Sequence, residues 1–122
     1  MTTSTHRKFV GETGWVETAY SDEASVDRAI LRPNGEFVVD FLYDGNRYTA
    51  TLKRMAGNAF RGTYVTQWEG RRYEGIISAR LFTSGDSAFL FGSWAEDGYN
   101  YHWWVDLHAV EHFPDEGKRR AI

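Results

Sequence analysis

The chain has 122 residues, of which 42% are hydrophobic, so it is long enough for one domain with a buried core and too short for two. Its formal net charge is −3 and its basic residues are scattered, which argues against a nucleic-acid partner. The lack of cysteine excludes disulfides, thiolate metal sites and thiol nucleophiles. No apolar run approaches the ~20 residues of a membrane helix, and residues 1–5 are polar, so we expect a cytoplasmic protein with no membrane partner.

Turn signals divide the chain into short segments rich in β-branched and aromatic residues. Glycine-containing turns recur at 33–35, 44–46, 56–58, 69–71, 84–86 and 97–98. Asn-Gly and Asp-Gly pairs favour tight hairpins, so the segments between the turns predict strands. The eight expected strands are 7–20, 25–32, 36–43, 47–54, 59–68, 72–82, 88–95 and 99–110. Ser21 is followed by acidic residues in the manner of a helix start, so 21–26 is a candidate short helix.

Consecutive hairpins place each strand antiparallel to the next, and closing the sheet removes its two exposed edges. We therefore predict an all-β fold, an eight-stranded antiparallel up-and-down meander barrel, formed by residues 1–113 as a single domain. Residues 114–122 are expected to form a charged, loose C-terminal tail.

Alternation along the strands assigns one face of each strand to the barrel interior. With common hairpin loop lengths, Phe41 faces Ala50, and the same level continues through small residues to a tryptophan: Gly62, Ala79, Gly92 and Trp103. Toward the turns at 44–46, 69–71 and 97–98 lies an aromatic mouth of Tyr43, Tyr48, Tyr64, Ile77, Trp94 and Tyr101. On the other side lies an aliphatic floor of Val39, Leu52, Phe60, Leu81, Leu90 and Val105. We predict that the small residues leave room for a ligand; alternatively, the glycines permit strand bending while large side chains fill the space.

Arg28 is predicted to face inward and to lie opposite Phe41. A buried guanidinium needs an anion, which would be a ligand carboxylate or phosphate, or Glu17 on the preceding strand. The alternative is that Ala29 and Leu31 face inward and that Arg28 is solvated. The inward tyrosines would donate hydrogen bonds to a ligand, act as general acids, or simply close the end of the barrel.

Residues 108–112 read His-Ala-Val-Glu-His, which matches the H-x-x-E-H pattern of one group of zinc peptidases. That chemistry needs two histidines one helical turn apart, whereas this segment ends a predicted strand. His102 is assigned to the outward face. We therefore predict no metal site and no cofactor.

Four aromatic residues are assigned to the outward face of three neighbouring strands: Phe82, Phe89, Phe91 and Trp104. Phe91 should lie opposite Trp104, and Phe82 close to Phe89. An aromatic patch of this kind seldom stays in water. We expect it to form the interface of a homodimer or larger homo-oligomer; the alternatives are coverage by the N-terminal segment or by the C-terminal tail.

The meander and two of its segments, Phe-Arg-Gly-Thr-Tyr at 60–64 and Phe-Gly-Ser-Trp at 91–94, resemble the strands of avidins. Gly14-Trp15 is similar to the Gly-x-Trp near the start of lipocalins, with a different spacing. The chain thus resembles the calycin-like β-barrels, the group of lipocalins, avidins and fatty-acid-binding proteins. The resemblance implies this fold and a tendency to bind small, partly apolar molecules, and it carries over no ligand residues.

We therefore expect a small-molecule binding protein that holds a small apolar or aromatic ligand in the barrel lumen, with a ligand carboxylate held by Arg28. The other predicted contact residues are Phe41, Tyr43, Tyr48, Ala50, Gly62, Tyr64, Ala79, Gly92, Trp94, Tyr101 and Trp103. One alternative is a small lyase or isomerase that combines inward tyrosines with Arg28 and Glu17. Another is a structural or protein-interaction module with a filled barrel.

Overall fold

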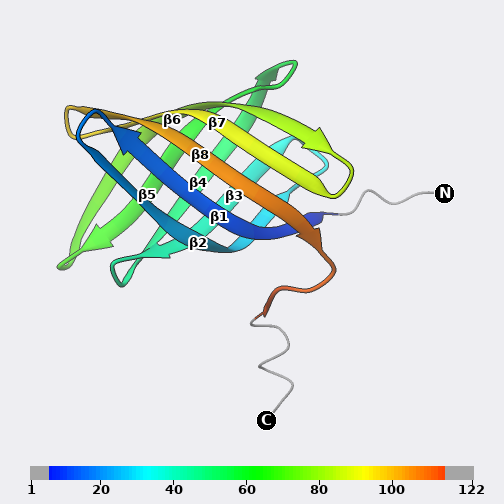
Figure 1. Cartoon of the computed structure of the whole chain (residues 1–122), viewed down its shortest axis with the longest axis horizontal. Coiled ribbons are helices and arrows are strands. Elements are labelled where there is room, and N and C mark those ends of the chain that lie inside the picture. Colours follow the sequence, from blue (N-terminus) through cyan, green and yellow to red (C-terminus); the bar gives the residue numbers. More distant parts are fainter. Residues whose placement is uncertain (1–5, 115–122) are drawn as a thin grey trace, which may run out of the picture.

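The computed structural model describes residues 6–114 and arranges them as eight β-strands. The strands are β1 (Arg7–Glu17), β2 (Tyr20–Leu31), β3 (Glu36–Tyr43), β4 (Asn46–Ala56), β5 (Ala59–Trp68), β6 (Arg71–Ser84), β7 (Ser87–Glu96) and β8 (Tyr99–Val110) (Figure 1). Each strand pairs antiparallel with the next, and β1 also pairs with β8, which closes the sheet into a barrel. The predicted fold class is confirmed. The predicted tail, 114–122, lies outside the described residues apart from its first residue.

The predicted short helix at 21–26 is wrong, because these residues belong to β2. A tight turn after Glu17 brings β2 back along β1, with Ser21 opposite Val16 and Ala24 opposite Thr13. This pairing satisfies the backbone groups that a helix would have paired internally. Among the described residues, no helix is long and apolar enough to cross a membrane.

Tight turns set the strand register at one end of the barrel. Asp44 and Gly45 have φ angles of 52° and 78°. Positive φ at both central residues is typical of a type I′ turn, whose twist matches that of the flanking strands. In the turns Glu69-Gly70 and Asp97-Gly98, both central residues also have positive φ angles. Each of these hairpins therefore reverses the chain in two residues.

The predicted inward faces of β3 to β8 are confirmed, but some predicted pairings are shifted. Ala79 and Gly92 pair as predicted, whereas Phe41 lies opposite Tyr48 instead of Ala50. In the structure only Asp44 and Gly45 lie between the paired residues Tyr43 and Asn46, and this tighter turn moves the pairing by two residues. Similar two-residue shifts occur between β4 and β5 and between β5 and β6. A shift of two leaves every side chain on its own face, because side chains alternate with a period of two.

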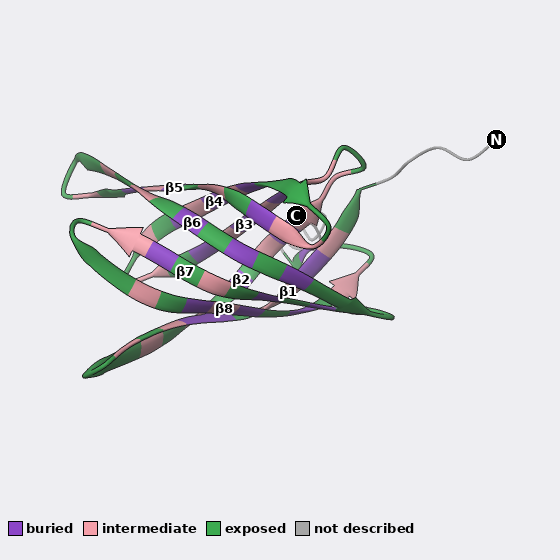
Figure 2. Ribbon diagram, turned by 90° about the horizontal axis from the view of Figure 1, so that it is seen from above, coloured by how far each residue is buried: buried purple, intermediate pink, exposed green. Residues whose placement is uncertain are grey.

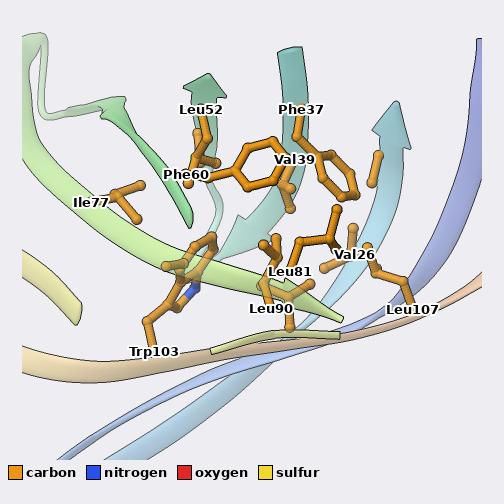
Figure 3. Close-up of a cluster of buried hydrophobic side chains, with 14 of the residues drawn as sticks. Val26, Phe37, Val39, Leu52, Phe60, Ile77, Leu81, Leu90, Trp103 and Leu107 are labelled. Carbon is orange, nitrogen blue, oxygen red and sulfur yellow. The ribbon is translucent and has the colours of Figure 1, made fainter. Parts of the chain in front are cut away.

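A hydrophobic core fills the half of the barrel nearest the start of β1 and the end of β8. Buried positions alternate with exposed ones along the strands (Figure 2), and the buried side chains from facing strands meet in the interior (Figure 3). Burying one such aliphatic or aromatic side chain contributes about 1.5–3 kcal/mol. The predicted floor residues are all buried: Val39, Leu52, Phe60, Leu81, Leu90 and Val105.

The small residues at the middle of the barrel allow strands to approach one another and do not open a cavity there. A Cβ added to Gly62 would lie 1.8 Å from the carbonyl oxygen of Thr51, and one added to Gly92 would lie 1.9 Å from that of Ser78. Only glycine fits such a close approach of backbone. Trp103 is fully buried and fills the interior at this level. The small residues therefore do not open the predicted cavity, and a large side chain fills the interior at this level, as the alternative expected.

Candidate functional site

The interior beneath four of the turns is an open cup. The β1–β2, β3–β4, β5–β6 and β7–β8 turns surround it, at the end of the barrel opposite the start of β1 and the end of β8 (Figure 1). Its volume is about 680 Å³, within the range of small-molecule sites. Its lining is dominated by aromatic side chains and comprises Trp15, Glu17, Tyr20, Phe41, Tyr43, Tyr48, Trp68, Glu69, Arg71, Tyr73, Trp94, Glu96, Tyr99 and Tyr101.

Stacked rings close the bottom of the cup. The rings of Phe41 and Tyr48 are nearly parallel, with centroids 5.2 Å apart. Trp94 stacks on Tyr64 with centroids 4.1 Å apart, and Trp103 lies 5.3 Å from Trp94 on the core side. Aromatic pairs contribute about 0.5–1.5 kcal/mol beyond their burial. These contacts hold the rings at the bottom of the cup in a fixed arrangement without a ligand.

Hydrogen bonds fix two of the tryptophans. The indole N–H of Trp68 donates to the Tyr48 hydroxyl at 2.8 Å, and that of Trp94 donates to Oε1 of Glu96 at 3.1 Å. The buried hydroxyl of Tyr64 has no hydrogen-bond partner among the described residues. Burial raises the pKa of Tyr64, and the nearby Glu96 carboxylate raises it further.

A hydrogen-bonded group of three side chains stands at the rim. The Tyr43 hydroxyl donates to Oδ2 of Asp22 at 2.5 Å, and the hydroxyls of Tyr20 and Tyr43 are 2.9 Å apart. The bond to Asp22 raises the pKa of Tyr43 far above its ordinary value, and the same bond lowers the pKa of Asp22. Tyr43 therefore stays protonated over the whole neutral range.

Arg28 lies on the outer face of the barrel, so the prediction that it faces the lumen is wrong. A β-bulge in β2 makes Asp27 an extra residue, and Arg28 pairs with Asp40 of β3. The bulge reverses the alternation, so that the buried residue is Ala29. The guanidinium of Arg28 lies 4.3 Å from the ring centroid of Phe113. The alternative that Ala29 faces inward is confirmed.

The structure divides the other predicted contact residues into three groups. The lining of the cup includes Phe41, Tyr43, Tyr48, Trp94 and Tyr101. Tyr64 and Trp103 lie beneath the lining and pack against Trp94. The described lining includes none of the small residues Ala50, Gly62, Ala79 and Gly92.

Sequence reasoning missed the lining residues at the ends of the strands. These are Trp15, Tyr20, Trp68, Glu69, Arg71, Tyr73, Glu96 and Tyr99. The signal was present, because alternation within a strand continues to its last residue. Trp68 shares the inward face of Tyr64, and Tyr99 that of Tyr101, so extending the pattern to the turns would have found both.

The outward aromatic patch is present as predicted. Phe82 pairs with Phe89, and Phe91 pairs with Trp104. The exposed fractions of the three phenylalanines are 51%, 38% and 49% in chain order. Trp104 is half-buried, because its indole covers Gly14 of β1. The patch spans β6, β7 and β8 on the outside of the barrel.

The H-x-x-E-H segment does not lie on one helix. His108 belongs to β8, whereas Glu111 and His112 follow the end of that strand. Within residues 6–114, no three His, Cys, Asp or Glu side chains form a group that could hold a metal ion. The segment therefore lacks the helical spacing that the zinc peptidases use.

Comparisons with protein-family models, with curated proteins and with solved structures found no match to this chain. The closed eight-stranded antiparallel barrel is compatible with a calycin-like fold.

Proposed function

We propose that this protein is a calycin-like binding protein whose cup takes a small molecule with a flat apolar or aromatic face. The observation that carries the proposal is a space of about 680 Å³ in which ten of the fourteen lining residues are aromatic. An eight-stranded barrel is just wide enough for one such ligand. Aromatic rings supply apolar contact area, while the phenol hydroxyls at the rim offer hydrogen bonds to polar groups of the ligand.

The lyase or isomerase alternative has less support. It needs Arg28, Glu17 and tyrosines together in the lumen, but Arg28 lies on the outer face. A general acid works best when its pKa is near the operating pH. The bond to Asp22 raises the pKa of Tyr43, which moves it further away from neutral pH. The rim residues are therefore suited to orienting a ligand and poorly suited to proton transfer.

The filled-barrel alternative fits only half of the interior. Packed side chains occupy the half nearest the start of β1, but the cup occupies the other half. A plain structural module gains no stability from an open aromatic cup, because apolar surface left in water gives no burial energy. The cup is thus the part of the fold that a ligand would complete.

Isothermal titration calorimetry with 2-(2-naphthyl)ethanol, a neutral aromatic probe, tests this proposal. We expect binding at one site per chain, and we expect Tyr101→Ala to weaken it by about threefold to tenfold through loss of one ring contact. Tyr101 is half-buried on the wall of the cup, so its truncation leaves the core intact. The matched control is Phe82→Ala, which removes an aromatic ring from the outer face and should bind like the parent. Equal weakening by both variants, or no binding to the parent, would contradict the proposal.

A further inference from the structure

Acidic side chains outnumber basic ones in the cup. Glu17, Glu69 and Glu96 line it, against Arg71. Arg71 is exposed at the start of β6, and its guanidinium lies 5.8 Å from the ring centroid of Tyr73. Within the described part of the chain, no ion pair joins Glu17 or Glu96 to a lysine or arginine. Among residues 6–114, the cup therefore presents three carboxylates against one guanidinium, and its lining carries a net negative charge.

Two of the carboxylates flank one point of the wall. Tyr101 lies on β8 between β1, which carries Glu17, and β7, which carries Trp94 and Glu96. Burial raises the pKa of Tyr101, and the charges of Glu17 and Glu96 raise it further, so both carboxylates act on the same hydroxyl. The indole N–H of Trp94 donates to Glu96 and holds that carboxylate beside the ring.

Two aromatic rings of the cup form a corner. Trp15 and Tyr43 have centroids 4.7 Å apart and ring planes 88° apart. A corner of two rings lets a compact cation contact both, and the face of an aromatic ring, tryptophan above all, attracts cations. Trp15, Trp68 and Trp94 all line the cup. The walls therefore combine the two elements that recognise an organic cation, ring faces and carboxylates.

Glu96 acts near the bottom of the cup. The Tyr64 side chain is fully buried beneath Trp94, and burial together with the Glu96 carboxylate raises the pKa of its hydroxyl. The indole N–H of Trp94 donates to the same carboxylate. A carboxylate therefore lies close to the rings on which the body of a ligand would stack.

We propose that the cup selects organic cations, namely protonated or quaternary amines carried on an aromatic or apolar body. The aromatic or apolar body of the ligand would stack on the rings at the bottom of the cup, and its cationic nitrogen would lie at the level of Glu17 and Glu96. This inference rests on the proposed function, because it names the charge class of the ligand that the same cup takes. It replaces the expectation of a ligand carboxylate, which depended on an inward Arg28.

The test is a calorimetric comparison of three ligands with one skeleton, 2-(2-naphthyl)ethylamine, 2-(2-naphthyl)ethanol and 2-naphthaleneacetate, the anion of naphthalene-2-acetic acid. They share the aromatic body and differ in charge, being a cation, a neutral molecule and an anion at neutral pH. We expect the amine to bind about fivefold or more tightly than the alcohol, and the acetate to bind weakest.

Charge-removing variants locate the effect. Glu17→Gln and Glu96→Gln should each weaken amine binding about threefold more than they change alcohol binding. Gln keeps the size of Glu, and its amide oxygen can still accept the bond from Trp94. The matched control is Glu12→Gln, which removes the same charge from an exposed position of β1 outside the cup and should bind every ligand like the parent. Arg71→Gln removes the positive charge from the lining and should strengthen amine binding.

Each outcome decides the inference. Preference for the amine that is reduced by Glu17→Gln or Glu96→Gln supports it. Equal binding of amine and alcohol overturns it and leaves the binding function standing. Tightest binding of the acetate, lost in Arg71→Gln, overturns it in favour of an anion site at the rim. Failure of all three ligands to bind overturns the inference together with the binding function.

Discussion

Asp22 accepts hydrogen bonds from two phenols at the rim of the cup. The Tyr43 hydroxyl donates to it at 2.5 Å and the Tyr20 hydroxyl at 3.3 Å. The bond from Tyr43 is the main cause that lowers the pKa of Asp22 below its ordinary value of 3.8, and the backbone N–H of Glu23 adds to it. A carboxyl group whose pKa is lowered by folding stabilises the folded state above its unfolded pKa. That contribution is lost as the pH falls through the folded pKa.

We predict that Asp22→Asn makes stability less sensitive to acid. The parent should melt at a higher temperature than the variant near neutral pH, because its carboxylate accepts charge-assisted bonds. The gap between the two melting temperatures should begin to shrink below about pH 4, where Asp22 of the unfolded chain takes up a proton, and should close as the pH falls through the lowered pKa of the folded state. Circular dichroism melts from neutral pH to about pH 2 measure this gap. Glu12→Gln is the control and should follow the parent; a gap that is constant at every pH would rule out the Asp22 explanation.

Gly92 marks the closest approach of β6 and β7, and the pairing of these strands depends on it. A methyl group there would lie 1.9 Å from the carbonyl oxygen of Ser78 and 2.5 Å from the Cα of Ala79. We predict that Gly92→Ala lowers the free energy of unfolding by about 2 kcal/mol or more, because the strands must separate. Urea denaturation checks this value. Ser93→Ala, one residue along on the exposed outer face, should stay within about 0.5 kcal/mol of the parent; equal stability of both variants would show that the strands adjust without cost.

The strands and their faces could be predicted because several local signals agree. Asp44-Gly45 and Asp97-Gly98 specify type I′ turns, and the alternation between them assigns the faces. The bulge in β2 could not be predicted, because two polar residues, Asp27 and Arg28, follow Val26. Strict alternation after Val26 makes Arg28 the next inward residue, whereas a bulge makes it Ala29. Only pairing with β1 and β3 decides between the two. The bulge therefore places Arg28 on the outer face and not in the expected site.

The cup lies at the end where the aromatic mouth was predicted, but its depth could not be predicted, because it depends on how the whole barrel is filled. Sequence alternation identifies inward residues but not the depth at which each side chain lies. The inward glycines suggested space at the middle of the barrel. Backbone atoms of neighbouring strands occupy the space beside Gly62 and Gly92. The open space lies instead where the strands end in turns, and Phe41 and Trp94 are among the residues that line it. Closure therefore divides the molecule into a packed half and an open half.

The outer surface carries a second feature at the scale of the whole molecule. The aromatic patch of Phe82, Phe89, Phe91 and Trp104 lies on a sheet face, and charges of opposite sign are its neighbours. Arg80 pairs with Phe91 across β6 and β7, and Asp106 pairs with Phe89 across β7 and β8. A twofold axis through the patch would bring the Arg80 of one copy toward the Asp106 of another. Such self-complementarity is what an isologous interface requires, so we propose that the patch joins two copies of the chain.

We predict that the parent is a dimer in solution and that Phe91→Asp makes it a monomer. A carboxylate at the centre of the patch would be buried without a partner, so the dissociation constant should rise by about 30-fold or more. The fold should survive, because Phe91 is half-exposed in the single chain. Sedimentation velocity over a range of concentrations measures the association, and Leu42→Asp is the matched control, since Leu42 is an equally exposed apolar residue of β3 outside the patch. A parent that sediments as a monomer at all concentrations, or a dimer that Phe91→Asp leaves intact, would show that the aromatic patch does not join two copies; the binding role of the cup is independent of either result.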